Sequence, residues 1–282
     1  MGEALALVSA LFFGTAHFLN GLLARRLDSA TVALIGQLGG TVLVLLAAPL
    51  FAAPHVSGSA LGWGALSGIG TGIGVAFLYR GMSNGRFSVV VPLSDVAAVA
   101  LPVLTGVVLL GDRPPLPAWC GIAAAPAALW LITRSGRGDD ERGGGTTALG
   151  AHDGLVAGAG FAMQFIALAQ ADAAAGLWPL VASRAASVLT LLPQIAHHPG
   201  RLRLPPRLGW SCLGAGGLGT LAIALYTLAT REQLLSLAVV LTALYPAIPV
   251  LLGVTVLRER LTRAQGTGLV CAAAAIALIS LA

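Results

Sequence analysis

Two charged residues lie inside apolar stretches that are long enough to cross a membrane: Asp95 within the fourth stretch and Arg184 near the middle of the seventh. A charge at the bilayer centre costs roughly 2.5–3.5 kcal/mol on insertion scales, so an ionisable residue at that depth is a candidate for function. Asp95 could take up and release a proton, and Arg184 could hold an anionic group such as a carboxylate. The two could also form a fixed structural ion pair between helices. The sequence leaves both interpretations open.

A second set of polar residues lies inside other apolar stretches. His17 and Asn20 are three residues apart, so a helix places them on one face. Because an unperturbed histidine titrates near pH 6.5, His17 could be a site that takes up and releases protons; alternatively, it is a neutral histidine that is hydrogen-bonded between helices. Gln37 and Gln164 could contact a substrate or link helices.

Three tyrosines are the only ones in the chain. Tyr79 and Tyr226 end the third and eighth apolar stretches, where an interfacial aromatic belt is the expected role and a gate is the alternative. Tyr245 lies deeper in its stretch, next to Pro246, and is the better candidate for lining a cavity.

Prolines and glycines mark where helices can bend or approach closely. Pro92, Pro102, Pro246 and Pro249 lie inside the fourth and ninth apolar stretches, where each removes an amide donor and frees a carbonyl, so we expect hinges there. Glycines at 64, 68 and 72 follow one helix face and predict close helix packing rather than a dinucleotide site.

The composition places the chain in a membrane. Of its 282 residues, 57% are hydrophobic and 10% are charged, and its mean hydropathy is +0.88. A soluble domain carries about 25% charged residues, so a water-soluble globule of this composition would leave too much apolar surface exposed. All 16 basic residues are arginine. The absence of lysine from the sequence argues against a Walker-type ATPase, a pyridoxal enzyme and a retinal pigment.

No catalytic or cofactor motif interrupts the apolar stretches. The sequence has no GxSxG nucleophile elbow, no HExxH zinc motif and no paired catalytic carboxylates. The three cysteines lie apart without metal-ligand spacing and are interpreted as packing residues. We therefore expect neither an enzyme nor a bound cofactor or metal. The net charge of +5 lies in short loops and indicates orientation in the membrane rather than a nucleic-acid partner.

The apolar stretches predict an all-α integral membrane protein with ten transmembrane helices of about 20 residues each. They fall at residues 3–24, 30–52, 60–79, 88–110, 116–133, 153–171, 176–195, 209–229, 235–257 and 264–282. Residues 134–151 are rich in glycine and mixed charge, which predicts a flexible, solvated linker with five helices on either side.

A single shift of 147 residues superposes the two halves of the chain, 1–133 and 152–282. The matched positions include Trp63 and Trp210, Tyr79 and Tyr226, Pro102 and Pro249, and Phe18 and Phe165. Because five is odd, the second copy must enter the membrane from the opposite side, which predicts two inverted repeats. Inverted repeats are typical of alternating-access transporters, whose substrate site lies where the halves meet. The shift maps Asp95 onto Thr242 and Arg184 onto Gln37, so both charges break the symmetry.

The segments that close the fourth and ninth stretches carry a family resemblance. They read ALPVLTGVVLLGDRP over residues 100–114 and YPAIPVLLGVTVLRERLT over residues 245–262. Both are similar to the apolar helix ending in a Gly-Glu-Arg signature in EamA-type members of the drug/metabolite transporter (DMT) superfamily. FGTAHF in the first stretch and LYRGMSNGRFSVV before the fourth also resemble segments of bacterial members. Two positions depart from the signature: Asp112 replaces its glutamate, and Arg258 replaces the glycine before Glu259.

The resemblance implies a secondary transporter. With the residues above, we expect proton-coupled export of a small polar or amphipathic metabolite, such as an amino acid or a drug, by alternating access. A channel-like or cation-permeation protein is the alternative, which a stack of polar rings would favour and the single charges Asp95 and Arg184 argue against. The expected partners are a small-molecule substrate, H+ and the lipid bilayer. The sequence leaves open whether the protein is a monomer or a homodimer.

The arginines predict how the chain lies in a bacterial inner membrane. Cytoplasmic loops carry an excess of basic residues. If both termini are external, the cytoplasmic loops hold Arg25, Arg26, Arg80, Arg86, Arg134, Arg137, Arg142, Arg201, Arg203, Arg207, Arg258, Arg260 and Arg263, and the other side holds Arg113 and Arg231. The arginine count therefore predicts external termini, whereas the family resemblance implies cytoplasmic ones.

Overall fold

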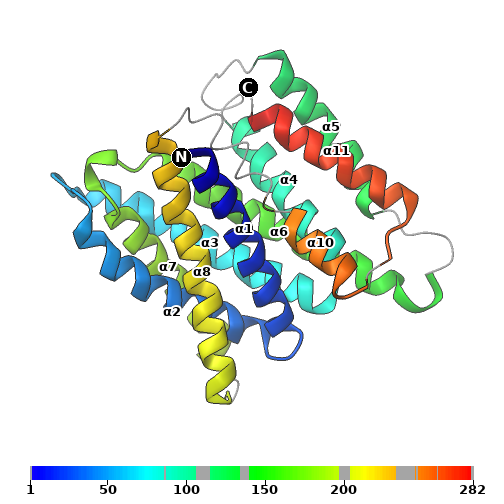
Figure 1. The fold of residues 1–282 in the computed structure, drawn as a ribbon, viewed down its shortest axis with the longest axis horizontal. Helices are drawn as coiled ribbons and strands as arrows, with labels where there is room; N and C mark the ends of the chain where they lie inside the picture. Colours follow the sequence, from blue (N-terminus) through cyan, green and yellow to red (C-terminus); the bar gives the residue numbers. More distant parts are fainter. Residues whose placement is uncertain are drawn as a thin grey trace.

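A computed structural model describes residues 2–85, 87–105, 115–133, 140–196, 204–232, 245, 247–258 and 260–280. All regular secondary structure in these ranges is helical, which confirms the predicted all-α class (Figure 1). The helices are α1 (Gly2–Ala24), α2 (Ser29–Ala47), α3 (Gly58–Asn84), α4 (Phe87–Thr105), α5 (Leu116–Thr133), α6 (Asp140–Ala169), α7 (Trp178–Ala196), α8 (Pro206–Glu232), α10 (Ala247–Thr255) and α11 (Arg263–Ser280), with 3-10 turns η1 (Ala48–Leu50) and η3 (Ala173–Ala175).

Several of these helices are long and apolar enough to cross a membrane. In the described ranges, four segments meet both conditions by length and composition: Ala4–Ala24, Ser29–Leu50, Gly58–Asn84 and Trp178–Ala196. Two shorter apolar helices cover Phe87–Ala98 and Arg263–Leu278. The helices lie on the apolar stretches of the sequence, as predicted.

The sixth helix begins earlier than the sequence suggested. We expected a flexible linker over residues 134–151, but α6 begins at Asp140, so the segment is helical from that residue onward. Residues 134–139 lie outside the described part of the chain.

The ninth predicted span also differs from the prediction. Residues 235–257 were expected to form one kinked helix, whereas Tyr245 lies in a turn and α10 begins at Ala247. The residue before a proline is disfavoured in the α conformation, which accounts for the turn at Tyr245. Residues 233–244 and Pro246 lie outside the described residues.

Glycines set the closest helix contacts. A Cβ atom at Gly64 would overlap the carbonyl oxygen of Pro179, and one at Gly68 would overlap that of Ser183. Gly72 faces the same helix, α7, at Thr190. The predicted glycine face on α3 is therefore confirmed, and it lets the backbones of α3 and α7 approach without intervening side chains.

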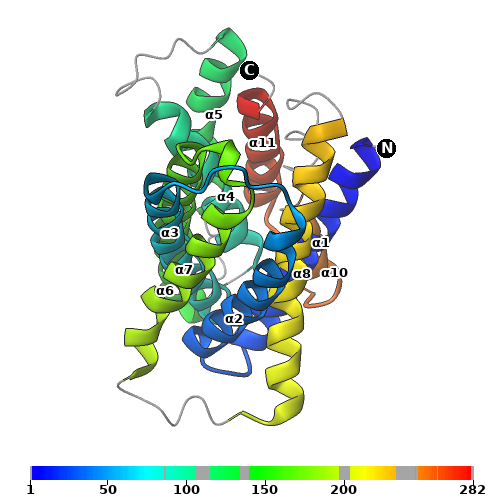
Figure 2. The same cartoon turned by 90° about the vertical axis from the view of Figure 1, so that its left-hand side faces the viewer.

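The helices pack in two groups. In the α3 group, α3 packs against α6 and α7, and α4 packs against α6; in the α8 group, α1 and α2 pack against α8. The pair α5 and α11 lies to one side of both groups, at the upper right of Figure 1 (compare Figure 2). Each group contains helices from both halves of the sequence.

The packing partners follow a symmetric pattern. Equivalent helices of the two halves are α1 and α6, α2 and α7, and α3 and α8. When each helix is replaced by its equivalent, the α1–α8 contact corresponds to the α6–α3 contact, and the α2–α8 contact corresponds to the α7–α3 contact. The contacts α2–α7 and α5–α11 join helices at corresponding places in the two halves.

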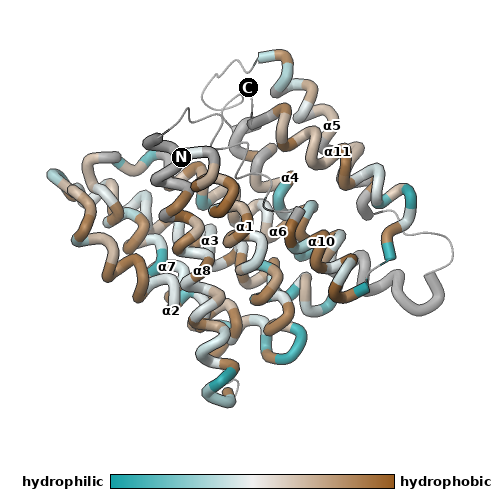
Figure 3. The backbone as a smooth tube through the Cα atoms, in the orientation of Figure 1, coloured by the Kyte–Doolittle hydropathy of each residue, from teal (hydrophilic) through white to brown (hydrophobic). Residues whose placement is uncertain are grey.

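Many large apolar side chains are exposed on the outside of the molecule, and hydrophobic residues recur along most of the helices (Figure 3). Leu50 is 82% exposed and Trp210 is 74% exposed. Hydrophilic residues gather at helix ends, such as the connection between α1 and α2. A surface of this kind fits a lipid environment rather than water.

One residue other than glycine has a backbone conformation in the left-handed region. Arg258 has φ +56° and is the only non-glycine residue of the described ranges with a positive φ. It stands where the signature of the resembling family has glycine, which adopts this conformation at no steric cost.

Candidate functional site

Asp95 lies on α4 with its side chain buried. Its Oδ1 accepts a short hydrogen bond from the hydroxyl of Tyr245, which stands in the turn before α10. Its Oδ2 is buried and has no hydrogen-bond partner among the described residues. Residues 150 positions apart thus meet at this carboxylate.

Aromatic rings from α1 surround Tyr245. The ring centroids of Phe13 and His17 each lie 5.7 Å from that of Tyr245, and the two rings stack on each other at 6.4 Å. The Nδ1 atom of His17 is buried without a hydrogen-bond partner in the described part of the chain. Tyr245 therefore joins the buried acid on α4 to the histidine on α1. We call Phe13, His17, Asp95 and Tyr245 the Asp95 cluster.

Arg184 on α7 meets Gln37 on α2. Its Nη1 donates to Oε1 of Gln37 at 2.7 Å, and its Nε is buried without a partner among the described residues. The buried phenol of Tyr79 lies within electrostatic range of this guanidinium. The side chain of Arg184 also passes close to Gly40. Arg184 thus retains donor capacity for an anionic group.

The ion pair considered for Asp95 and Arg184 is absent: neither residue contacts the other. α4 packs against α6, α10 and α11, whereas α7 packs against α3 and α2. The two charges consequently lie in different helix interfaces and form two separate sites.

Asn20 and Gln164, the remaining polar candidates, each form a side-chain hydrogen bond. Asn20 donates from Nδ2 to the carbonyl oxygen of Ala16 at 2.8 Å, and its Oδ1 is buried without a partner in the described ranges. Gln164 accepts at Oε1 from the hydroxyl of Thr71 at 2.7 Å, so it links α6 to α3. The link between helices was one of the two roles that the sequence left open for Gln164.

Tyr79 lies in the hydrophobic core, where its side chain is 6% exposed. The helix α3 continues beyond Tyr79 to Asn84, so Tyr79 is not the last residue of its helix. Tyr226 lies on α8, and its side chain falls outside the described residues.

The predicted hinge prolines occupy two helices. Pro92 and Pro102 lie within α4, and Pro249 is buried in α10. Pro92 is buried five residues after the start of its helix. Pro246 lies outside the described part.

Sequence reasoning missed an ion pair between α3 and α6. The guanidinium of Arg80 holds the buried carboxylate of Asp153 with two hydrogen bonds, of 3.0 Å from Nε and 2.6 Å from Nη2. The same guanidinium lies 4.3 Å from the ring centroid of Phe77. Arg80 was counted only as a loop arginine, and no spacing signal relates it to Asp153, 73 residues away.

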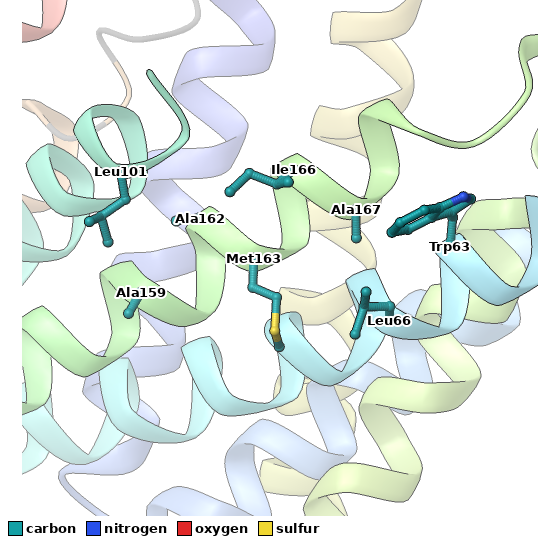
Figure 4. Close-up of a pocket in the computed structure, with 8 residues that line it drawn as sticks. All are labelled: Trp63, Leu66, Leu101, Ala159, Ala162, Met163, Ile166 and Ala167. Atoms are coloured by element: carbon teal, nitrogen blue, oxygen red, sulfur yellow. The ribbon is translucent and has the colours of Figure 1, made fainter. Parts of the chain in front are cut away.

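An apolar cavity of about 290 Å³ opens between α3, α4 and α6. Figure 4 shows Trp63 and Leu66 on one wall, Met163 and Ile166 along α6, and Leu101 at the other end. None of the polar residues described above lines it, so this cavity is separate from both charged sites.

Comparison with known proteins gives one family and one fold. The model of the EamA-like transporter family matches residues 1–134 and residues 149–281. A solved structure described as "Crystal structure of protein" is similar to this chain with a TM-score of 0.58 and 18% sequence identity, over 98% of this chain and 95% of that one. A likeness at this identity concerns the fold alone. No curated protein matches the chain.

Proposed function

Because the chain belongs to the EamA-like transporter family, we propose that it is a secondary active transporter that exports a small polar or amphipathic metabolite in exchange for protons. Family membership makes it a multi-pass membrane transporter of the drug/metabolite type. Proton coupling, export and the class of substrate are our proposals. We base them on the two buried charged sites.

The observation that carries the proposal is the position of the charges between helices that pack in different groups. The bond from Arg184 to Gln37 joins α7 of the α3 group to α2 of the α8 group. The bond from Tyr245 to Asp95 joins α4 of the α3 group to the turn before α10, a helix that packs on α1 of the α8 group and also on α4. Movement of one group against the other would open and close both contacts, as alternating access requires.

We infer that the halves 1–133 and 152–282, separated by the segment 134–151, are inverted repeats. Three observations support this inference. The family model matches twice, the helix contacts are symmetric under exchange of the halves, and Arg184 meets its equivalent, Gln37. A site at the meeting of the halves would lie near the middle of the bilayer.

We assign Asp95 as the proton carrier and Arg184 as the holder of an anionic substrate group. A buried carboxylate with one unpartnered oxygen is costly when charged, so uptake of a proton relieves that cost. Arg184 keeps its charge and offers the planar fork that a carboxylate accepts. We assign His17, Asn20 and Gln37 as further polar contacts for the proton or the substrate, and Pro92, Pro102, Pro246 and Pro249 as the hinges.

A pH-jump flux assay tests the function. The substrate is first found by a thermal-shift screen of the purified protein against amino acids, sugars, nucleosides and cationic drugs. In proteoliposomes, an imposed pH gradient should then drive its uptake against a concentration gradient. Asp95→Asn, which cannot exchange a proton, should lose this driven uptake but keep exchange of labelled for unlabelled substrate once the substrate concentration is raised to saturate the variant. Asp172→Asn, which alters an exposed carboxylate, is the matched control.

Two outcomes contradict the proposal in different ways. Unchanged proton-driven uptake in Asp95→Asn would remove Asp95 from the mechanism. Flux that never saturates and shows no counterflow would indicate a channel-like protein.

A further inference from the structure

The Asp95 cluster holds two buried polar atoms that have no hydrogen-bond partner among the described residues. They are Oδ2 of Asp95 and Nδ1 of His17. A neutral imidazole with its proton on Nε2 offers Nδ1 as an acceptor. The two acceptors belong to one cluster because Tyr245 contacts both side chains, through its hydroxyl and through its ring.

The same cluster presents aromatic rings. Phe13 and Tyr245 lie with ring centroids 5.7 Å apart at a tilt of 45°, next to the imidazole of His17. The faces of phenyl and phenol rings attract cations, and the attraction increases when water is excluded. A buried carboxylate beside these rings also attracts a cation, and it repels an anion.

We propose that Phe13, His17, Asp95 and Tyr245 bind the ammonium group of an organic substrate, and that this ammonium carries N–H donors. The proposal rests on the proposed transport function and names the substrate class for its acidic site. One N–H would donate to Oδ2 of Asp95 and a second to Nδ1 of His17, while the rings cover the charge.

The need for N–H donors separates this site from one for quaternary ammonium ions. A trimethylammonium group would be attracted by the charge and the rings, but it would leave both buried acceptors without a donor. The hydroxyl of Tyr245 already satisfies Oδ1, so the free oxygen defines where the ligand binds.

Calorimetric titration of the detergent-purified full chain tests the proposal with three matched probes. The probes are 2-phenylethylamine, its N,N,N-trimethyl analogue and 2-phenylethanol, which share a phenylethyl body and differ in the head group. We expect the primary amine to bind most tightly. The trimethyl analogue should bind roughly tenfold more weakly, because it forms no hydrogen bond to a charged group, and the neutral alcohol should bind more weakly still.

Variants locate the binding in the cluster. Asp95→Asn should weaken binding of the primary amine by roughly 10- to 100-fold, the value of a charge-assisted hydrogen bond. Phe13→Leu keeps an apolar side chain at this position, although a smaller one, removes one ring and should weaken binding by roughly 3- to 30-fold. Asp172→Asn should bind as the unaltered protein does. Since Phe13→Leu leaves the buried acid in place, it tests the site even if Asp95→Asn fails to fold.

The outcomes distinguish this proposal from the proposed function. Equal affinity for the amine and the alcohol, or amine binding unaffected by both variants, would overturn the ammonium site. Counterflow of labelled 2-phenylethylamine in proteoliposomes is measured in parallel. Selective binding without counterflow would support the ammonium site and contradict transport of this ligand. Transport of other compounds without amine binding would overturn the ammonium site and leave the proposed function standing.

Discussion

Arg184 donates a hydrogen bond of 2.7 Å to Gln37, and the two residues are 147 positions apart, the shift that superposes the two halves of the sequence. Residues related by a two-fold axis touch only where they lie at that axis. The contact therefore supports an axis between α2 and α7. Two arginines at a two-fold axis would repel each other. An arginine opposite a glutamine, as in Arg184 and Gln37, avoids this repulsion because the amide oxygen accepts a hydrogen bond from the guanidinium.

Exchanging these two side chains tests their equivalence. Arg184→Gln alone should lower the specificity for an anionic substrate at least about tenfold, because a charge-assisted hydrogen bond is lost. Gln37→Arg combined with Arg184→Gln restores one guanidinium and one amide at the axis, so it should recover a large part of that loss. Substrate counterflow in proteoliposomes measures both. A double variant no better than Arg184→Gln would show that the two positions are not equivalent.

Two glycine-to-alanine substitutions, one on the packed face of α3 and one on α8, should change stability in opposite directions. A Cβ at Gly68 would overlap the carbonyl oxygen of Ser183, so Gly68→Ala should destabilise the protein by about 1–3 kcal/mol through forced separation of α3 and α7. Gly214 has no atom within 4 Å of an added Cβ, so Gly214→Ala should stabilise α8 by about 0.5–1 kcal/mol. Thermal unfolding in detergent measures the difference. Equal midpoints for the two variants would contradict the close packing of α3 on α7.

The left-handed backbone at Arg258 predicts a stabilising substitution. A side chain in this conformation costs about 1–2 kcal/mol, which glycine avoids, although glycine loses up to about 1 kcal/mol in unfolded-chain entropy. Arg258→Gly should therefore raise the midpoint of thermal unfolding slightly. Arg260→Gly is the control, because Arg260 has no positive φ, and it should lower the midpoint or leave it unchanged. A lower midpoint for Arg258→Gly would mean that contacts of the arginine outweigh its backbone strain.

The arginine count predicts that both termini are external. The ends of the described chain lie toward the same side of the molecule in Figures 1 and 2. A C-terminal alkaline phosphatase fusion should be active and a C-terminal green fluorescent protein fusion dark, because each reporter works on one side of the inner membrane. The opposite pattern would show cytoplasmic termini and would mean that other features of the chain override its arginines.

Local properties could be predicted from the sequence because they depend on neighbours along the chain. The helix positions follow apolar stretches, and the glycine face of α3 follows a spacing of four residues. Helix ends were harder to predict than helix positions: the apolar stretch ends at Tyr79, whereas α3 continues to Asn84.

Partners distant in the chain could not be predicted. Asp95 and Arg184 were identified as the unusual charges, but each finds an uncharged partner: Tyr245 for Asp95 and Gln37 for Arg184. No local pattern specifies which helix packs against which, so the pair Arg80 and Asp153 was also missed.

Composition and periodicity are properties of the chain alone, so the amino-acid sequence was enough to predict the helical class, the membrane setting, the duplication and the two unusual charges. The structure was needed to find that these charges lie in separate helix interfaces, that Asp95 is joined through Tyr245 to an aromatic cluster on α1, and that Arg184 meets its own counterpart. The physical reason is that helix packing brings together residues about 150 positions apart, and their proximity sets the chemistry of each site.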